Sequence, residues 1–172
     1  KYTNSILVED LVSHFKILAS DSLEGRETGK LGQKMAAEYI ANQFRRIGIP
    51  PYKSKTYYQK FKVKSRGHLR QRIILKKKYV KGENVLGFIE GTDLKDEILI
   101  ITAHYDHLGK KDSLVYNGAD DNVSGTAAIL EIAEAFMKAK KDSAGPRRSV
   151  LIMPVSGEEK GLLGSKYYTE NP

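Results

Sequence analysis

Three short stretches of the sequence carry side chains that could do chemistry. They contain His104 with Asp106, the pair Asp120-Asp121, and the pair Glu158-Glu159. Imidazole and carboxylate groups are suitable ligands for a divalent metal such as zinc, and the chain has no Cys that could supply a thiolate. Several carboxylates held close together without a cation would repel one another. The residue types therefore predict a metal site, provided that the fold brings the three stretches together.

Each stretch taken alone also has a simpler explanation. A single histidine at the end of a strand is usually a packed or solvated side chain. Asp120 and Asp121 could cap the helix that follows them, because carboxylates are favoured at the positive N-terminus of a helix. Glu158 and Glu159 could do the same for the next helix. Only the convergence of all three stretches in one cleft favours a metal site.

The periodicity of the chain predicts that convergence. An apolar run over 98–103, rich in β-branched residues, predicts a buried strand that ends at His104. Residues 125–141 predict a helix, and 150–155 a second buried strand that ends just before Glu158. The two strands of such a unit are parallel and joined by a right-handed crossover, so their ends lie at one edge of the sheet. The middle stretch then lies beside them, at the start of the crossover helix.

The other elements complete a single α/β domain over residues 1–172, with a mixed, centrally parallel β-sheet flanked by helices. Amphipathic spacing predicts a helix over 8–19, with His14 on its solvent side. The remaining predictions are a helix at 31–47, a half-exposed strand at 57–64, strands at 72–80 and 84–91 joined by a turn at Lys81-Gly82, and a short helix at 161–169.

The net charge of +8 is a local feature. Twelve of the 29 Lys and Arg residues lie in 51–82, a segment without Asp or Glu, and the rest of the chain has more acidic than basic residues. The run Lys76-Lys77-Lys78 is typical of an exposed sheet edge that discourages pairing with other sheets; binding of an anionic partner is the alternative. We expect no nucleic-acid partner, because no nucleic-acid motif is present. No apolar run approaches the ~20 residues that cross a bilayer.

The same three stretches carry a resemblance to a known family. His104-Tyr105-Asp106-His107-Leu108-Gly109, the segment from Asn117 to Gly125 and the segment from Gly157 to Ser165 resemble the motifs of the secreted di-zinc aminopeptidases of metallopeptidase clan MH. The segments Leu18 to Arg26 and Ala36 to Ile40 resemble the corresponding parts of the bacterial members. The match covers nearly the whole chain.

The resemblance implies a zinc-dependent aminopeptidase that hydrolyses the N-terminal peptide bond of a peptide with a free N-terminus. His104 would bind one of two zinc ions, Asp120 would bridge them, and Glu159 would bind the other. Asp106 would accept the second ring N–H of His104 and so fix its orientation. Glu158 would be the general base, which takes a proton from water and passes it to the leaving amine.

Further expectations follow from the resemblance. The Asp120-Asp121 peptide bond would be cis, and His107 and Asp121 would be structural or supporting residues. The protein would be secreted or periplasmic.

The family site has five protein ligands, and its last two, an Asp and a His, have no counterpart before Pro172. We therefore expect a sheet truncated at its C-terminal side, weak zinc binding and no appreciable peptidase activity from residues 1–172 alone. The missing C-terminal part of the catalytic domain, or a second chain, would supply the rest. The alternatives are a glutaminyl cyclase-like acyltransferase and a non-catalytic binding module on the same fold.

Overall fold

The computed structural model describes residues 1–64 and 79–172. In chain order the elements are η1 (Tyr2–Ser5), α1 (Val8–Leu18), η2 (Asp21–Arg26), α2 (Leu31–Ile47), β1 (Tyr58–Lys64), β2 (Tyr79–Val85), β3 (Gly87–Ile89), β4 (Leu94–His104), β5 (Gly109–Lys111), β6 (Leu114–Tyr116), η4 (Ala119–Val123), α3 (Ser124–Lys141), β7 (Arg148–Val155) and α4 (Leu163–Glu170).

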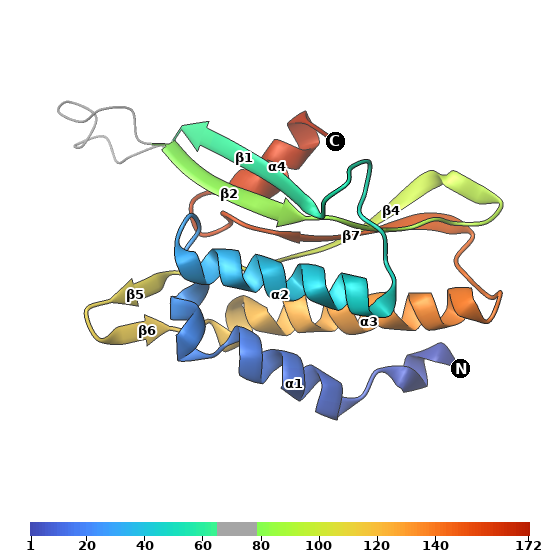
Figure 1. Ribbon diagram of the computed structural model, residues 1–172, viewed down its shortest axis with the longest axis horizontal. Helices are drawn as coiled ribbons and strands as arrows, with labels where there is room; N and C mark the ends of the chain where they lie inside the picture. Colours follow the sequence, from blue (N-terminus) through green and yellow to red (C-terminus); the bar gives the residue numbers. More distant parts are fainter. Residues whose placement is uncertain (65–78) are drawn as a thin grey trace.

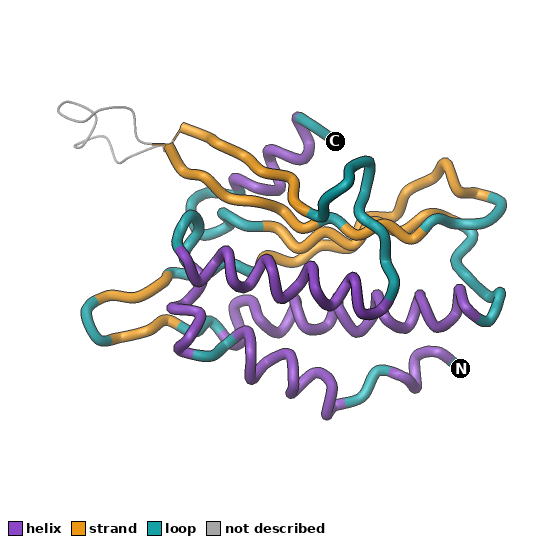
Figure 2. The backbone as a smooth tube through the Cα atoms, in the orientation of Figure 1, coloured by secondary structure: helices purple, strands orange, loops and turns teal. Residues whose placement is uncertain are grey.

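A three-stranded sheet in the order β3-β7-β4 forms the centre of the fold. β7 runs parallel to β4, with Ile100 opposite Leu151, and antiparallel to β3. α3 makes the crossover between β4 and β7. Figures 1 and 2 show α1, α2 and α3 on one side of this sheet and α4 on the other. The predicted α/β class, with a mixed, centrally parallel sheet flanked by helices, is confirmed.

The helix that packs under the sheet was predicted with its observed bounds. α2 buries Ala36, Ile40, Phe44 and Ile47 along one stripe, in the main hydrophobic core. Gly48 ends the helix in the left-handed conformation, with φ of 83°, and its N–H donates to the carbonyl oxygen of Phe44. Glycine is favoured at this position because it adopts positive φ without a steric cost.

The apolar run of β4 is not buried, contrary to the prediction. Ile98, Leu99 and Ile100 keep 42%, 50% and 42% of their surface exposed. In the described part of the chain β4 pairs with β7 along one edge and has no strand along its other edge. The apolar pattern predicted a buried strand, but a strand with a neighbour along only one edge leaves part of such a run exposed.

The predicted exposure of His14 is also wrong. Its side chain is buried between three helices, where Nδ1 lies 2.7 Å from the Tyr39 hydroxyl of α2 and Nε2 lies 3.1 Å from Glu131 of α3. The side of α1 that was assigned to solvent therefore packs against α2 and α3. Helical periodicity within α1 could not reveal these two polar partners.

The predicted turn at Lys81-Gly82 is absent from the structure, because β2 runs through it and pairs antiparallel with β1. Gly82 lies opposite Phe61, and a Cβ added at this glycine would come within 2.5 Å of the phenyl ring. Close packing, and not a turn, accounts for this glycine. Most of the predicted strand at 72–80, and the Lys76-Lys77-Lys78 run, lie outside the described residues.

The helices of the described segments include none that is both long enough and apolar enough to cross a bilayer.

Candidate metal centre

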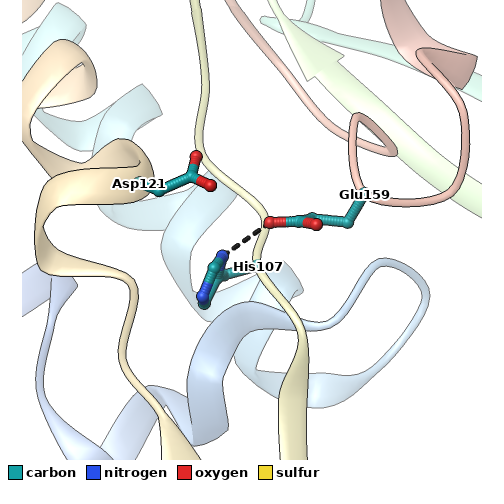
Figure 3. Close-up of side chains that lie close together, drawn as sticks. All are labelled: His107, Asp121 and Glu159. Atoms are coloured by element: carbon teal, nitrogen blue, oxygen red, sulfur yellow. Dashed lines mark hydrogen bonds and ion pairs between the residues drawn. The ribbon is translucent and has the colours of Figure 1, made fainter.

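The three predicted stretches converge at one edge of the central sheet. β4 ends at His104, directly opposite Val155 at the end of β7, so the loops that follow both strands leave the sheet together. The loop after β7 carries Glu158 and Glu159, and η4 brings its two aspartates to the start of α3. Figure 3 shows side chains from all three segments facing a common space. The parallel strand pair produces this convergence, as the sequence predicted.

Asp121 is the carboxylate that lies between the other groups. Its Oδ1 is 3.0 Å from Nε2 of His104. On its other side it lies near His107 and Glu159, and the potential ligand atoms of these three residues are within 4.8 Å of one another. Asp121 thus faces an imidazole on one side and an imidazole–carboxylate pair on the other, which is the place that a shared carboxylate would take.

Asp120, which the resemblance assigned to that place, is positioned differently. Its side chain is exposed, and its main-chain oxygen accepts a hydrogen bond of 2.6 Å from the Ser124 hydroxyl. Within the described residues it is not part of the group with Glu159. The expected cis bond at Asp120-Asp121 is wrong, because the cis peptide bond lies between Asp121 and Asn122. Two adjacent residues of the same type cannot be told apart by composition; the backbone path through η4 turns the second into the cleft.

The simpler explanation of the acidic pairs as helix caps does not fit the structure. Asn122, and neither aspartate, accepts the hydrogen bond from the N–H of Gly125 in the first turn of α3, at 2.9 Å. α4 begins at Leu163, and its N-cap residue makes no side-chain capping bond. The carboxylates of Asp121 and Glu159 instead lie against the imidazoles of His104 and His107.

Asp106 is completely buried and joins two of the loops. Its Oδ2 accepts a hydrogen bond of 2.7 Å from the Thr28 hydroxyl, and its Oδ1 accepts one of 3.2 Å from the main-chain N–H of Glu158. Nδ1 of His104 lies 3.2 Å from the main-chain oxygen of Asp106, and the carboxylate is farther from it, at 3.8 Å. Asp106 therefore fixes the position of Glu158 directly, and the His104 ring interacts with its main chain.

Arg26 is a supporting residue that the sequence did not reveal. The side chain is completely buried, and it donates to the main-chain oxygens of Leu18, of Tyr105 at 2.7 Å and of Asn117 at 2.9 Å. Burial lowers the pKa of this guanidinium to about 10, so it stays charged at neutral pH. Its partners are carbonyl groups far apart in sequence, which leave no side-chain pattern to detect. It ties the segment before α2 to the loops that carry the metal-binding groups.

His107, which was expected to be a structural or supporting residue, lies in one group with Asp121 and Glu159. Its Nδ1 lies 2.6 Å from Oε1 of Glu159. The main chain forms an isolated β-bridge with Glu27. The ring packs on Gly118, where an added Cβ would come within 2.5 Å of the imidazole. Imidazole nitrogen and carboxylate oxygen, the atom types gathered here, are those that bind zinc when no thiolate is present.

The family model for peptidase family M28 matches residues 84–172, which include all three converging stretches. The chain belongs to peptidase family M28. The predicted resemblance to zinc aminopeptidases is confirmed at the level of this family.

Two curated relatives each match about half of the chain. A probable glutamate carboxypeptidase of Arabidopsis thaliana is 37% identical over 90 residues, which are 52% of this chain and 12% of the relative. A rat aminopeptidase, NAALADL1, is 41% identical over 88 residues, which are 51% of this chain and 11% of the relative. The chain thus spans only a small part of the length of these relatives.

The fold extends the likeness to nearly the whole chain. A zinc aminopeptidase from Bacillus subtilis superposes with a TM-score of 0.72 at 16% identity, covering 97% of this chain and 66% of that one. At this level of identity the match demonstrates a shared fold.

Proposed function

We propose that residues 1–172 form the N-terminal part of a zinc-dependent aminopeptidase, which uses activated water to hydrolyse the N-terminal peptide bond of a peptide. The observation that carries this proposal is the placement of Asp121 close to both His104 and Glu159. Membership of family M28 supports a peptidase reaction.

The metal-binding roles follow from this placement, with one change from the sequence-based expectation. His104 and Asp121 would hold one zinc ion, and Glu159 and Asp121 the other, so Asp121 takes the bridging role in place of Asp120. Zinc held there would polarise the scissile carbonyl and lower the pKa of a water molecule to about 7. The remaining ligands would come from sequence outside residues 1–172 or from a second chain.

Glu158 is the candidate general base. Its main-chain N–H donates to the buried carboxylate of Asp106, which fixes the backbone of Glu158 in the loop after β7. From there its side chain would accept a proton from water and deliver it to the leaving amine, the task of a positioned carboxylate in peptide hydrolysis. Asp106 acts through this contact as a positioning residue.

The substrate would be a peptide with a free N-terminus, and the protein would work outside the cytoplasm. Both statements rest on the resemblance of the motifs to secreted aminopeptidases. One of the two curated relatives is named a carboxypeptidase and the other an aminopeptidase, so their names do not agree on which end of a peptide is cleaved. Cleavage at the N-terminal end is therefore part of the proposal.

The test compares Glu158→Gln with Glu159→Gln in the complete protein. Glu158→Gln should lower kcat for an aminoacyl-nitroanilide by at least about 10²-fold, the low end for loss of a general base, and leave the zinc content unchanged. Glu159→Gln should lower the zinc content, because it removes a ligand. Metal loss from Glu158→Gln with a full zinc content in Glu159→Gln would show that the two roles are exchanged.

The same protein distinguishes the cyclase alternative. With a peptide that begins with glutamine, an aminopeptidase releases free glutamine, whereas a glutaminyl cyclase releases ammonia and leaves a pyroglutamyl peptide of unchanged length. Mass spectrometry of the products separates the two reactions. Ammonia release without hydrolysis would overturn the proposed function, as would the absence of turnover from the zinc-loaded complete protein with either substrate.

A further inference from the structure

We propose that Thr28 is a positioning residue for Glu158, and that it acts through the buried carboxylate of Asp106. The inference rests on the proposed function, in which Glu158 is the general base, and it adds a residue that none of the assigned roles includes. Thr28 precedes α2, whereas the family model matches only residues 84–172. A segment outside the matched part of the chain would therefore help to build the site.

The hydroxyl group of Thr28 joins two loops. Its Oγ1 donates a hydrogen bond of 2.7 Å to Oδ2 of Asp106, and it lies 3.1 Å from Oγ of Ser156. The other oxygen of the Asp106 carboxylate accepts a hydrogen bond of 3.2 Å from the main-chain N–H of Glu158. Ser156 and Glu158 are two residues apart in the loop after β7. The three contacts therefore close a ring that holds the backbone of this loop.

The protons available in this ring fix the direction of its hydrogen bonds. A carboxylate only accepts hydrogen bonds, and a hydroxyl group has one proton to donate. Because Thr28 gives its proton to Asp106, the hydroxyl of Ser156 is the donor in the contact with Thr28. Thr28 thus donates and accepts with a single atom. A valine of nearly the same shape could do neither.

The ring is shielded from water. Thr28 is 4% exposed, and Asp106 and Ser156 are completely buried. A buried oxygen that loses its donor is costly, because solvent does not replace the lost hydrogen bond at that place. Without the Thr28 hydroxyl, we expect the Asp106 carboxylate to turn toward other donors and the backbone of Glu158 to shift with it.

The residue before Thr28 holds the same loop in a weaker way. Oε1 of Glu27 lies 2.8 Å from Nζ of Lys160, and these side chains are 31% and 30% exposed. Water screens an ion pair of this kind, so it contributes little to the position of the loop. Glu27 is therefore a control for Thr28, one position away in the same segment.

The position of Glu158 matters because a general base must lie within hydrogen-bond reach of the proton that it accepts. A displacement of about 1 Å can lower the rate about 10²-fold. A displaced base weakens the chemical step and leaves substrate binding unchanged, so the effect should appear in kcat and not in KM.

The experiment compares Thr28→Val, Thr28→Ser and Glu27→Gln in the complete protein, with an aminoacyl-nitroanilide as substrate. Thr28→Val should lower kcat about 10- to 100-fold and keep KM and zinc content within about twofold of the unchanged protein. Thr28→Ser restores the donor and Glu27→Gln removes only a partly exposed pair, so both should keep kcat within about twofold. Equal kcat in Thr28→Val and Thr28→Ser, or equal losses in Thr28→Val and Glu27→Gln, would overturn the inference.

A double-mutant cycle with Glu158→Gln tests whether the hydroxyl acts through Glu158. In the Glu158→Gln protein, Thr28→Val should change kcat by less than about twofold, because the base that Thr28 positions is already absent. The same loss in both backgrounds is the result of a purely structural role and would overturn the inference. Full kcat in Glu158→Gln would refute the proposed role of Glu158 as well. Loss in Glu158→Gln with full kcat in Thr28→Val would refute the inference alone.

A measurement on the unchanged protein covers the case in which Thr28→Val fails to fold. The hydroxyl proton of Thr28 is buried and held by a carboxylate, so it should exchange slowly with water and be visible in ¹H NMR spectra. A Thr28 hydroxyl proton that exchanges too rapidly to be detected would overturn the inference.

Discussion

The two parallel strands that carry the metal centre, β4 and β7, differ sharply in their surroundings. Both are apolar and both end at the cleft, but Val150, Leu151 and Ile152 of β7 are at most 1% exposed, whereas Leu99 of β4 is 50% exposed. β7 has a strand on each side, and β4 is at the end of the described sheet. An apolar run is therefore found both in a strand with two neighbours and in a strand with one neighbour in the described sheet.

The proposed metal centre uses residues at the ends of both strands. Glu158 and Glu159 follow the fully packed strand and are held through Asp106, which is completely buried. Asp121, the most exposed of the proposed ligands, lies on η4 and contacts His104 at the end of β4. The glutamates thus follow a strand that is packed on both sides, whereas Asp121 contacts the end of a strand that is partly exposed.

Leucine-to-alanine substitutions test the comparison most strongly. Leu151→Ala should lower the free energy of unfolding by about 2–5 kcal/mol, because it leaves a cavity in the core. Leu99→Ala should change it by no more than about 0.5–1 kcal/mol, because half of this side chain is already in water. Urea unfolding followed by circular dichroism measures both. Equal losses would show that β4 is covered in solution, and the comparison between the strands would fail.

An exposed ion pair near the beginnings of the two strands gives a smaller effect. Hydrogen bonds from Arg147, before β7, hold the pKa of Asp93, before β4, at about 2. A carboxyl with a lowered pKa stabilises the fold above its unfolded pKa of about 3.9, and this contribution is lost as the pH falls toward 2. ¹³C NMR titration should give a pKa for Asp93 near 2, and Arg147→Gln should raise it toward the ordinary value. An unchanged pKa in Arg147→Gln would mean that the pair does not form in solution.

The sequence was sufficient for those features that depend on local pattern. The bounds of α2 follow from its apolar stripe and from Gly48, and the parallel pair β4–β7 follows from the strand–helix–strand order. Convergence of the acidic stretches with His104 follows in turn from that pair.

Features that depend on contacts between distant segments could not be predicted in this way. The buried partners of His14 come from two other helices, and those of Arg26 are main-chain carbonyls. The choice between Asp120 and Asp121 depends on the backbone path through η4, which adjacent residues of one type do not reveal.

That choice is also the most direct test of the metal centre. Asp120→Asn and Asp121→Asn are matched variants that differ by one position and remove the same charge. Zinc per chain of the complete protein is measured by inductively coupled plasma mass spectrometry after dialysis. It should fall sharply in Asp121→Asn and stay at the level of the unchanged protein in Asp120→Asn. A full zinc content in Asp121→Asn, with loss in Asp120→Asn, would contradict the assignment of Asp121 as the shared ligand.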